Sequence, residues 1–184
     1  MNPIETLKTE HHLILRVLDA LENYATKVQF GVAVSNGDLQ QFVAFNRQFA
    51  DACHHGKEEH ILFTAMTENG FPRDRGPIAV MLAEHAEGRR LVGILAIMAE
   101  KAEAWNDDDR AMITKSALAY VHLLRQHIKK EDNVLFPGAE ANLPPEVMKQ
   151  IGEKFEKFEQ EETGPGAHER FHTLADSLIA RYAK

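Results

Sequence analysis

The 184-residue sequence has a single cysteine and no long apolar run. One thiol cannot form an intrachain disulfide, so packing must hold the core, and a reducing compartment such as the cytoplasm is expected. The longest apolar stretch, Leu91 to Ala99, falls well short of the roughly 20 residues that span a bilayer. Residues 1–12 lack the basic and apolar regions of a secretory signal. We therefore expect neither a membrane-spanning segment nor a signal peptide.

Positive charge is also scarce, with 21 Lys and Arg against 28 Asp and Glu and a net charge of −7. The basic residues are spread along the chain, whereas nucleic acids and anionic membranes are bound by clustered Lys and Arg. The sequence therefore predicts neither as a partner. Hydrophobic residues at 44% and charged residues at 27% are typical of a folded chain that is long enough to bury a core.

Strand-like alternation is missing as well, and apolar residues recur at helical spacing instead. Four long helices are predicted: Ile4 to Phe30, an N-cap at Asp38 to Met66, Pro77 to about Trp105, and the acidic turn at 106–109 to Pro137. Long helices joined by short loops favour an all-α, up-down-up-down four-helix bundle. We expect this bundle to occupy residues 1–140.

Two further amphipathic segments follow Pro144 and Pro145. Their apolar stripes are Val147, Ile151, Phe155 and Phe158 in the first, and Phe171, Leu174, Leu178 and Tyr182 in the second. Such stripes need burial, so residues 141–184 are predicted to form a two-helix extension that packs on the bundle, on a second copy in a homodimer, or on another protein. His168 and His172 have the spacing of a zinc-binding pair, although their polar surroundings favour solvated side chains.

What the chain does contain is a repeat of histidines and acids. The phrase CHHGKEEHILFTA at 53–65 returns as QHIKKEDNVLFPG at 126–138, and TEHHLILRVL around His11 returns as AEHAEGRRLV around His85. Each half thus has one Glu-His pair and, 42 or 43 residues later, one His-x-x-x-Glu motif. The repeat predicts two equivalent helical hairpins.

The spacing within each hairpin places these residues at one level of the bundle. With a rise of about 1.5 Å per residue, His11 and Glu58 lie at similar distances from the loop between their helices, and so do His85 and His127. Residues four apart share a helix face, so each His-x-x-x-Glu motif directs both side chains to one centre. Four imidazoles and two carboxylates are costly to bury without cations and exceed what one tetrahedral zinc binds. The sequence therefore predicts two metal ions, with the ligands His11, His54, Glu58, His85, His127 and Glu131.

This ordered set resembles the hemerythrin-like (HHE cation-binding) family over about Ile4 to Pro137. The resemblance implies a four-helix bundle around a non-haem di-iron centre, in which Glu58 and Glu131 bridge the two irons. Manganese and zinc are chemically acceptable substitutes for such ligands.

Two features depart from the oxygen-carrying members of that family. Those carriers have a second third-helix histidine where this chain has Arg89, and their fourth-helix acid would correspond to Asp132 rather than Glu131. The replacement for the missing imidazole is left open between His55, His122 and a water. Glu59, Asp132, Glu10 and Glu84 are predicted to lie behind the ligands or in solvent, with Glu59 and Asp132 kept as alternative ligands, and His12 and His60 are expected on the surface.

The resulting expectation is a non-haem di-iron protein that binds a small ligand, namely O2, NO or peroxide, in oxygen, nitric oxide or iron handling. A di-iron enzyme, such as a peroxidase, an oxidase or an iron–sulfur repair protein, is one alternative. A metal-responsive sensor or interaction module is another, because metal binding contributes to folding. The ferritin-like oxidase pattern needs Glu-x-x-His on two helices, and the chain has it only at Glu169 to His172, outside the bundle.

Overall fold

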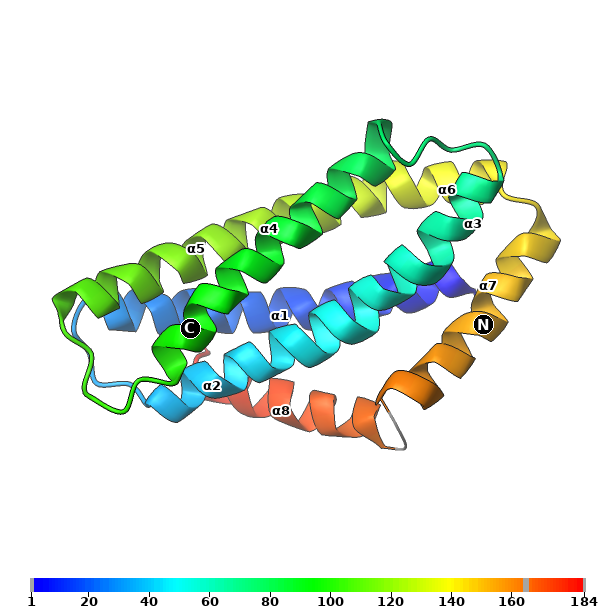
Figure 1. Ribbon diagram of the computed structural model, residues 1–184. Helices are drawn as coiled ribbons and strands as arrows, with labels where there is room; N and C mark the ends of the chain where they lie inside the picture. The colour runs from blue at the N-terminus through cyan, green and yellow to red at the C-terminus, as the bar shows by residue number, and fades with distance from the viewer. Residues whose placement is uncertain (1, 164–165, 184) are drawn as a thin grey trace.

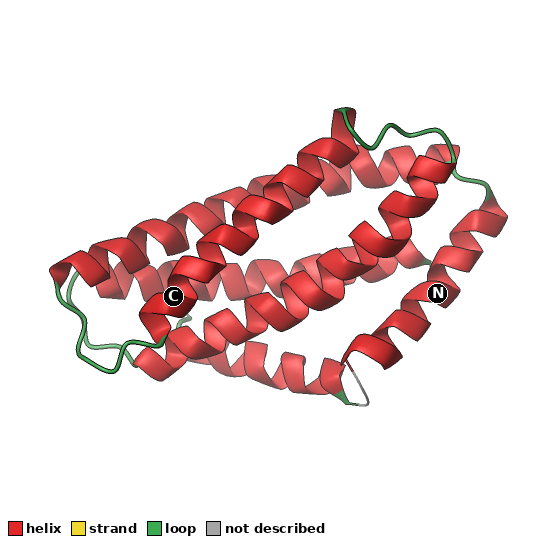
Figure 2. Cartoon of the chain, in the orientation of Figure 1, coloured by secondary structure: helices red, strands yellow, loops and turns green. Residues whose placement is uncertain are grey.

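The computed structural model describes residues 2–163 and 166–183, apart from the side chains at 162, 163, 167 and 168. All regular elements in these ranges are helical, which confirms the all-α prediction (Figures 1 and 2). The first and third long helices of the bundle are α1 (Pro3–Gln29) and α4 (Gly76–Ala99). The second long helix is α2 (Asn36–Phe45), continued by the π-helical segments η1 (Asn46–His55) and η2 (Glu58–Leu62) and by α3 (Phe63–Glu68). The fourth is α5 (Asp107–Lys130), continued by the π-helical η3 (Glu131–Leu135) and by α6 (Phe136–Asn142). The extension consists of α7 (Pro145–Phe158), the π-helical η4 (Glu159–Thr163) and α8 (Ala167–Arg181).

Three predicted helix ends were wrong. The second helix has its N-cap at Ser35, and Asp38 inside it accepts a hydrogen bond from Tyr182, the residue that follows α8. The third helix ends at Ala99, beyond which the Trp105 indole folds back to donate to the Met98 carbonyl. The fourth helix runs past Pro137 to the end of α6. Pro137 lies in the first turn of α6, directly after the π-helical η3, where backbone hydrogen bonds span five residues instead of four. The regular α-helical hydrogen bonds are therefore already interrupted at the position where proline lacks its N–H group.

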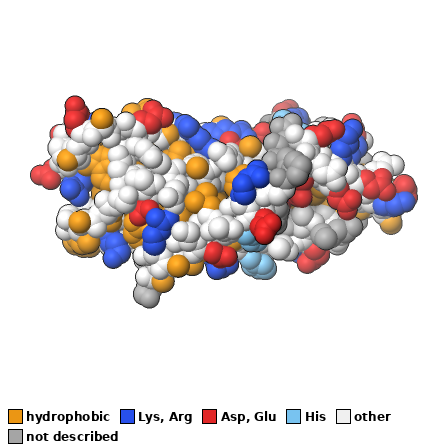
Figure 3. All heavy atoms as spheres, turned by 90° about the horizontal axis from the view of Figure 1, so that it is seen from below, with side chains coloured by type: hydrophobic (Ala, Val, Ile, Leu, Met, Phe, Trp, Pro, Cys, Tyr) orange, Lys and Arg blue, Asp and Glu red, His pale blue; other side chains and the backbone are white. Residues whose placement is uncertain are grey.

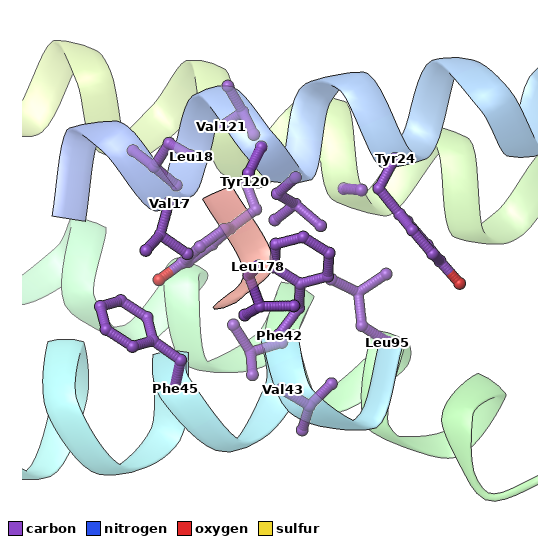
Figure 4. Close-up of a cluster of buried hydrophobic side chains, with 14 of the residues drawn as sticks. Val17, Leu18, Tyr24, Phe42, Val43, Phe45, Leu95, Tyr120, Val121 and Leu178 are labelled. Atoms are coloured by element: carbon purple, nitrogen blue, oxygen red, sulfur yellow. The ribbon is translucent and has the colours of Figure 1, made fainter. Parts of the chain in front are cut away.

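The core falls into two apolar clusters along the bundle axis. The first cluster contains apolar residues from positions 13–28 of α1, the start of the second helix, the end of α4 and most of α5. Figure 4 shows part of this cluster around Phe42, Tyr120 and Leu178. The second gathers Ile4 and Leu7 with residues from α3, α6 and the start of α4. On each of the four long helices the predicted ligands lie between these clusters, so apolar packing excludes water from both sides of them.

The extension packs on its own bundle. Phe171 and Leu178 of α8 belong to the first cluster, and Ile151 and Phe155 of α7 belong to the second. Its apolar stripes are therefore buried or half-buried against this chain's own bundle. The boundary at residue 140 stays a prediction. The zinc pair suggested for α8 is not tested, because the side chain of His168 lies outside the described residues.

On the surface, acidic and basic side chains are interspersed over the face seen in Figure 3. Within the described ranges, no helix is both long enough and apolar enough to cross a membrane.

Candidate metal centre

All six predicted ligands come together in one buried layer, and His55 joins them. Each of these seven side chains is at most 4% exposed. Their donor atoms form two groups, within each of which the atoms lie within 4.8 Å of one another. The first group is His55, Glu58, His85 and His127, and the second is His11, His54, Glu58 and Glu131.

The two carboxylates lie between the groups. Glu58 places Oε1 3.7 Å from Nε2 of His54 and Oε2 3.5 Å from Nε2 of His85. Glu131 places Oε2 3.3 Å from Nε2 of His11 and Oε1 3.3 Å from Nε2 of His127. Each carboxylate thus faces one imidazole from each group, which is the arrangement that a bridging carboxylate needs.

The atoms at the centre lack partners. All four carboxylate oxygens of Glu58 and Glu131, and Nε2 of His11, are buried without a hydrogen bond from any described residue. A buried polar group in this state costs about 1–3 kcal/mol, and more when it is charged. Cations between the carboxylates would satisfy these atoms, so the residues present fit a pair of metal ions.

The pKa shifts of the candidate imidazoles differ in direction. Burial alone would lower the pKa values of His11 and His127, but the neighbouring carboxylates outweigh it and raise both, that of His127 to about 9, so a cation bound at these two rings competes with a proton. Burial lowers the pKa values of His54, His55 and His85, so these imidazoles are neutral and can offer a lone pair. Burial and the neighbouring Glu131 charge raise the pKa of Glu58. Burial alone would also raise the pKa of Glu131, but the charge of His127 and the nearness of His11, whose Nε2 lies 3.3 Å from Oε2 of Glu131, outweigh it and lower that pKa.

Behind the ligands, a second ring of acids orients each imidazole. For each of the five candidate imidazoles, a carboxylate accepts a hydrogen bond from Nδ1, so that Nε2 is turned toward the centre. The pairs are His11 with Asp132 at 2.9 Å, His54 with Glu10 at 2.8 Å, His85 with Glu59 at 2.7 Å, His127 with Glu84 at 3.0 Å and His55 with Asp51 at 3.3 Å. Glu59 and Asp132 therefore support ligands here rather than facing the centre themselves. Sequence reasoning missed Asp51, whose counterpart in the repeat, Leu124, is not an acid.

His55 occupies the place of the imidazole that the sequence left open. His122 is exposed, as are His12 and His60. The His55 ring stacks on that of His85 with centroids 3.8 Å apart. A π-helical backbone allows His54 and His55, adjacent in sequence, to reach opposite groups of the same centre.

Arg89 supports this arrangement from the surface. Its Nε donates to Asp51 at 2.8 Å and its Nη2 donates to Glu59 at 2.7 Å, and these two acids lie behind His55 and His85. The residue that replaces the second third-helix histidine of the oxygen carriers thus holds the acids that orient the neighbouring ligands.

Lys57 is a buried lysine that sequence reasoning missed. Its ammonium group contacts Glu10, the acid behind His54, and Oε1 of Glu159 in η4 at 2.6 Å. Glu10, Cys53 and Glu159 have the spacing of a further metal site, but Lys57 already supplies the positive charge that they surround. Burial raises the pKa of the Cys53 thiol to about 12, which leaves it protonated.

The family model described as the hemerythrin HHE cation binding domain matches residues 2–139. The chain belongs to this family. The match covers the first three long helices, the fourth up to residue 139, and every residue of the two candidate metal-binding groups. Membership in the hemerythrin HHE family shows a cation-binding domain, and the two His/Glu groups are where the geometry allows cations to bind.

Two curated relatives extend the likeness beyond the bundle. They are the uncharacterized protein Rv1995 of Mycobacterium tuberculosis and the uncharacterized protein Mb2018 of Mycobacterium bovis. Each is 23% identical over 174 residues, which are 95% of this chain and 66% of the relative. The chain therefore spans just under two thirds of their length, and the match includes much of the extension. No solved structure matches the chain significantly.

Proposed function

We propose that this hemerythrin HHE domain holds two non-haem iron ions and binds a small diatomic or peroxidic ligand at them. The supporting observation is the set of carboxylate oxygens that lack hydrogen bonds and face imidazole nitrogens in a layer closed by apolar packing. Iron held by imidazoles and carboxylates supplies redox chemistry and affinity for O2, NO or peroxide. Manganese or zinc would suit the same donors, although zinc offers no redox change.

The proposed ligand sets are unequal. His55, His85 and His127 would hold one ion, His11 and His54 would hold the other, and Glu58 and Glu131 would bridge the two. The position with two imidazoles has fewer protein ligands, which leaves room there for a small molecule. The ring of acids fixes the imidazoles before any metal arrives, so little reorganisation is needed on binding.

A metal-responsive module remains the second candidate function because a chain of contacts joins the extension to one of the candidate ligands. Glu159 of the extension reaches Lys57, which reaches Glu10 behind His54. A change in metal occupancy at His54 therefore has a direct route to the extension.

The cytoplasmic location stays a prediction.

Spectroscopy of the iron-loaded protein tests the proposed function. We expect a new visible absorption band when NO, O2 or peroxide is added to anaerobic ferrous protein, and no band when the zinc-loaded protein is treated in the same way. A band that disappears when the gas is removed would support reversible binding, whereas bleaching with product formation would favour an enzyme. Iron-loaded protein that responds to none of the three ligands would contradict the proposal.

A further inference from the structure

A small cavity lies directly beside the candidate metal centre. It has a volume of about 80 Å³ and is bordered by η1, α4 and α5. Its buried lining residues are Asn46, His55, Gly88, Val92 and Tyr120. Of the other lining residues, Asp51 is half-buried, and Arg47 and Arg89 are exposed. We name it the His55 cavity, because His55 is the only candidate ligand that lines it.

The sequence repeat shows why the cavity exists on one side of the bundle. His11 corresponds to His85 and His54 to His127, so each lining position has an equivalent in the other half. Gly88 is equivalent to Ile14, Asp51 to Leu124, and His55 to Ile128. Those three aliphatic residues are buried together in the first core cluster. The cavity thus occupies a region that apolar side chains fill in the other half.

The polar groups of the lining are already engaged. The Tyr120 hydroxyl donates to Oδ1 of Asn46 at 3.0 Å, and Nδ2 of Asn46 donates to the Phe42 carbonyl at 2.8 Å. Asp51 accepts from His55 and from Arg89. With these groups paired among themselves, the inner wall offers mainly aromatic rings, Val92 and the Gly88 backbone. Such a wall suits a small uncharged molecule, and the volume admits only roughly two or three molecules of water size.

His55 separates the cavity from the centre. Its ring lines the cavity, while one of its nitrogens lies within 4.8 Å of donor atoms of Glu58, His85 and His127. At 3.3 Å its contact with Asp51 is the longest of the five contacts between histidines and the acids behind them. Among the candidate imidazoles, His55 is therefore the one held most weakly from behind, and it is the one with space beside it.

We infer that the His55 cavity is the entry site through which a small uncharged molecule, of diatomic or hydrogen peroxide size, reaches the metal centre, and that His55 moves to admit it. The inference rests on the proposed function, because it names the route for the ligand proposed there. It places entry on the side with three imidazoles, where the two halves of the repeat differ, and the molecule passes from there to the position beside His11 and His54 that has fewer protein ligands.

Filling the cavity tests this inference. Gly88→Ile introduces the residue found at the equivalent position of the other half, and a Cβ at Gly88 would lie 3.5 Å from Cε2 of Tyr120, an ordinary contact. Gly93→Ile is the matched control, because a Cβ at Gly93 on the same helix meets nothing within 4 Å. If Gly88→Ile does not fold, Gly88→Ala reduces the same cavity by a smaller amount.

Two measurements are made on the wild type and on both variants. Xenon titration followed by NMR needs no metal, and apolar cavities of this kind bind xenon. We expect xenon binding in the wild type and in Gly93→Ile and its loss in Gly88→Ile. Stopped-flow association of NO with the ferrous protein is expected to be slower by roughly tenfold or more in Gly88→Ile at unchanged iron content.

Equal rates of NO association in Gly88→Ile and in the wild type would overturn the inference, and so would an absence of xenon binding in the wild type. A folded protein that holds no iron would instead remove the proposed function, and the xenon titration would still report on the cavity. The two failures are therefore distinguishable.

Discussion

Glu58→Gln is expected to stabilise the metal-free protein and to remove most of its stabilisation by metal. In the metal-free state both oxygens of Glu58 are buried without partners, beside the carboxylate of Glu131. A neutral amide of the same shape removes a charge that the site cannot satisfy, which is worth about 1–3 kcal/mol. With metal present the same change removes the ligand shared by both groups, so the order of stabilities reverses.

The pH dependence follows from the raised pKa of Glu58. A group whose pKa is raised on folding stabilises the protein fully only below its unfolded pKa of about 4.3 and loses this contribution as the pH rises toward the folded value. The advantage of metal-free Glu58→Gln should therefore be present at pH 7 and shrink toward pH 4.

Urea denaturation with and without added metal measures both effects. Glu68→Gln is the matched control, because Glu68 is exposed on α3 and its replacement should change stability little in either state. Metal-free Glu58→Gln that is less stable than the wild type, or a variant that metal stabilises as strongly as it does the wild type, would contradict the assignment of Glu58.

Lys57→Ala is expected to destabilise the metal-free protein by about 3–5 kcal/mol, because it leaves the buried Glu10 without its ion pair. The repeat supplies a matched control. Lys130 contacts Glu84 as Lys57 contacts Glu10, but its side chain is 41% exposed, whereas that of Lys57 is 0% exposed. Lys130→Ala should therefore cost no more than about 1 kcal/mol.

The difference between the two lysines comes from the extension. Glu159 and the Phe155 ring cover Lys57, with the ammonium group 5.7 Å from the ring centroid. Phe158 packs so closely on Gly56 that a Cβ there would lie 2.8 Å from the ring. Chemical denaturation of both variants measures the loss in free energy of unfolding. Equal losses for Lys57→Ala and Lys130→Ala would show that the extension does not support the site.

The repeat explains why so much of the centre could be predicted from the sequence. Helical spacing and equal distances from the loops were enough to bring His11, Glu58, His85 and Glu131 to one level, since both depend only on regular helix geometry. The fold class followed from the same periodicity. The position of these residues as neighbours is observed, and their ligation stays a proposal.

The features that could not be predicted depend on irregular backbone or on distant packing. A regular α-helix separates neighbouring side chains by about 100°, which directs His55 away from His54, and the π-helical turn that brings both to the centre has no signal in the sequence. The role of Lys57 depends on Glu159, 102 residues away. The third helix ends at Ala99, and Trp105 beyond it folds back onto Met98, a contact that helix propensity does not encode.

Counting the metal ions bound per chain tests most directly whether the two His/Glu groups each hold an iron ion. The protein would be purified without oxygen, titrated with ferrous iron, freed of excess metal and analysed for iron and for protein. We expect two iron ions per chain in the wild type and a loss of at least one in Glu58→Gln. A folded wild-type protein that retains no iron, or a Glu58→Gln variant that still retains two, would contradict it.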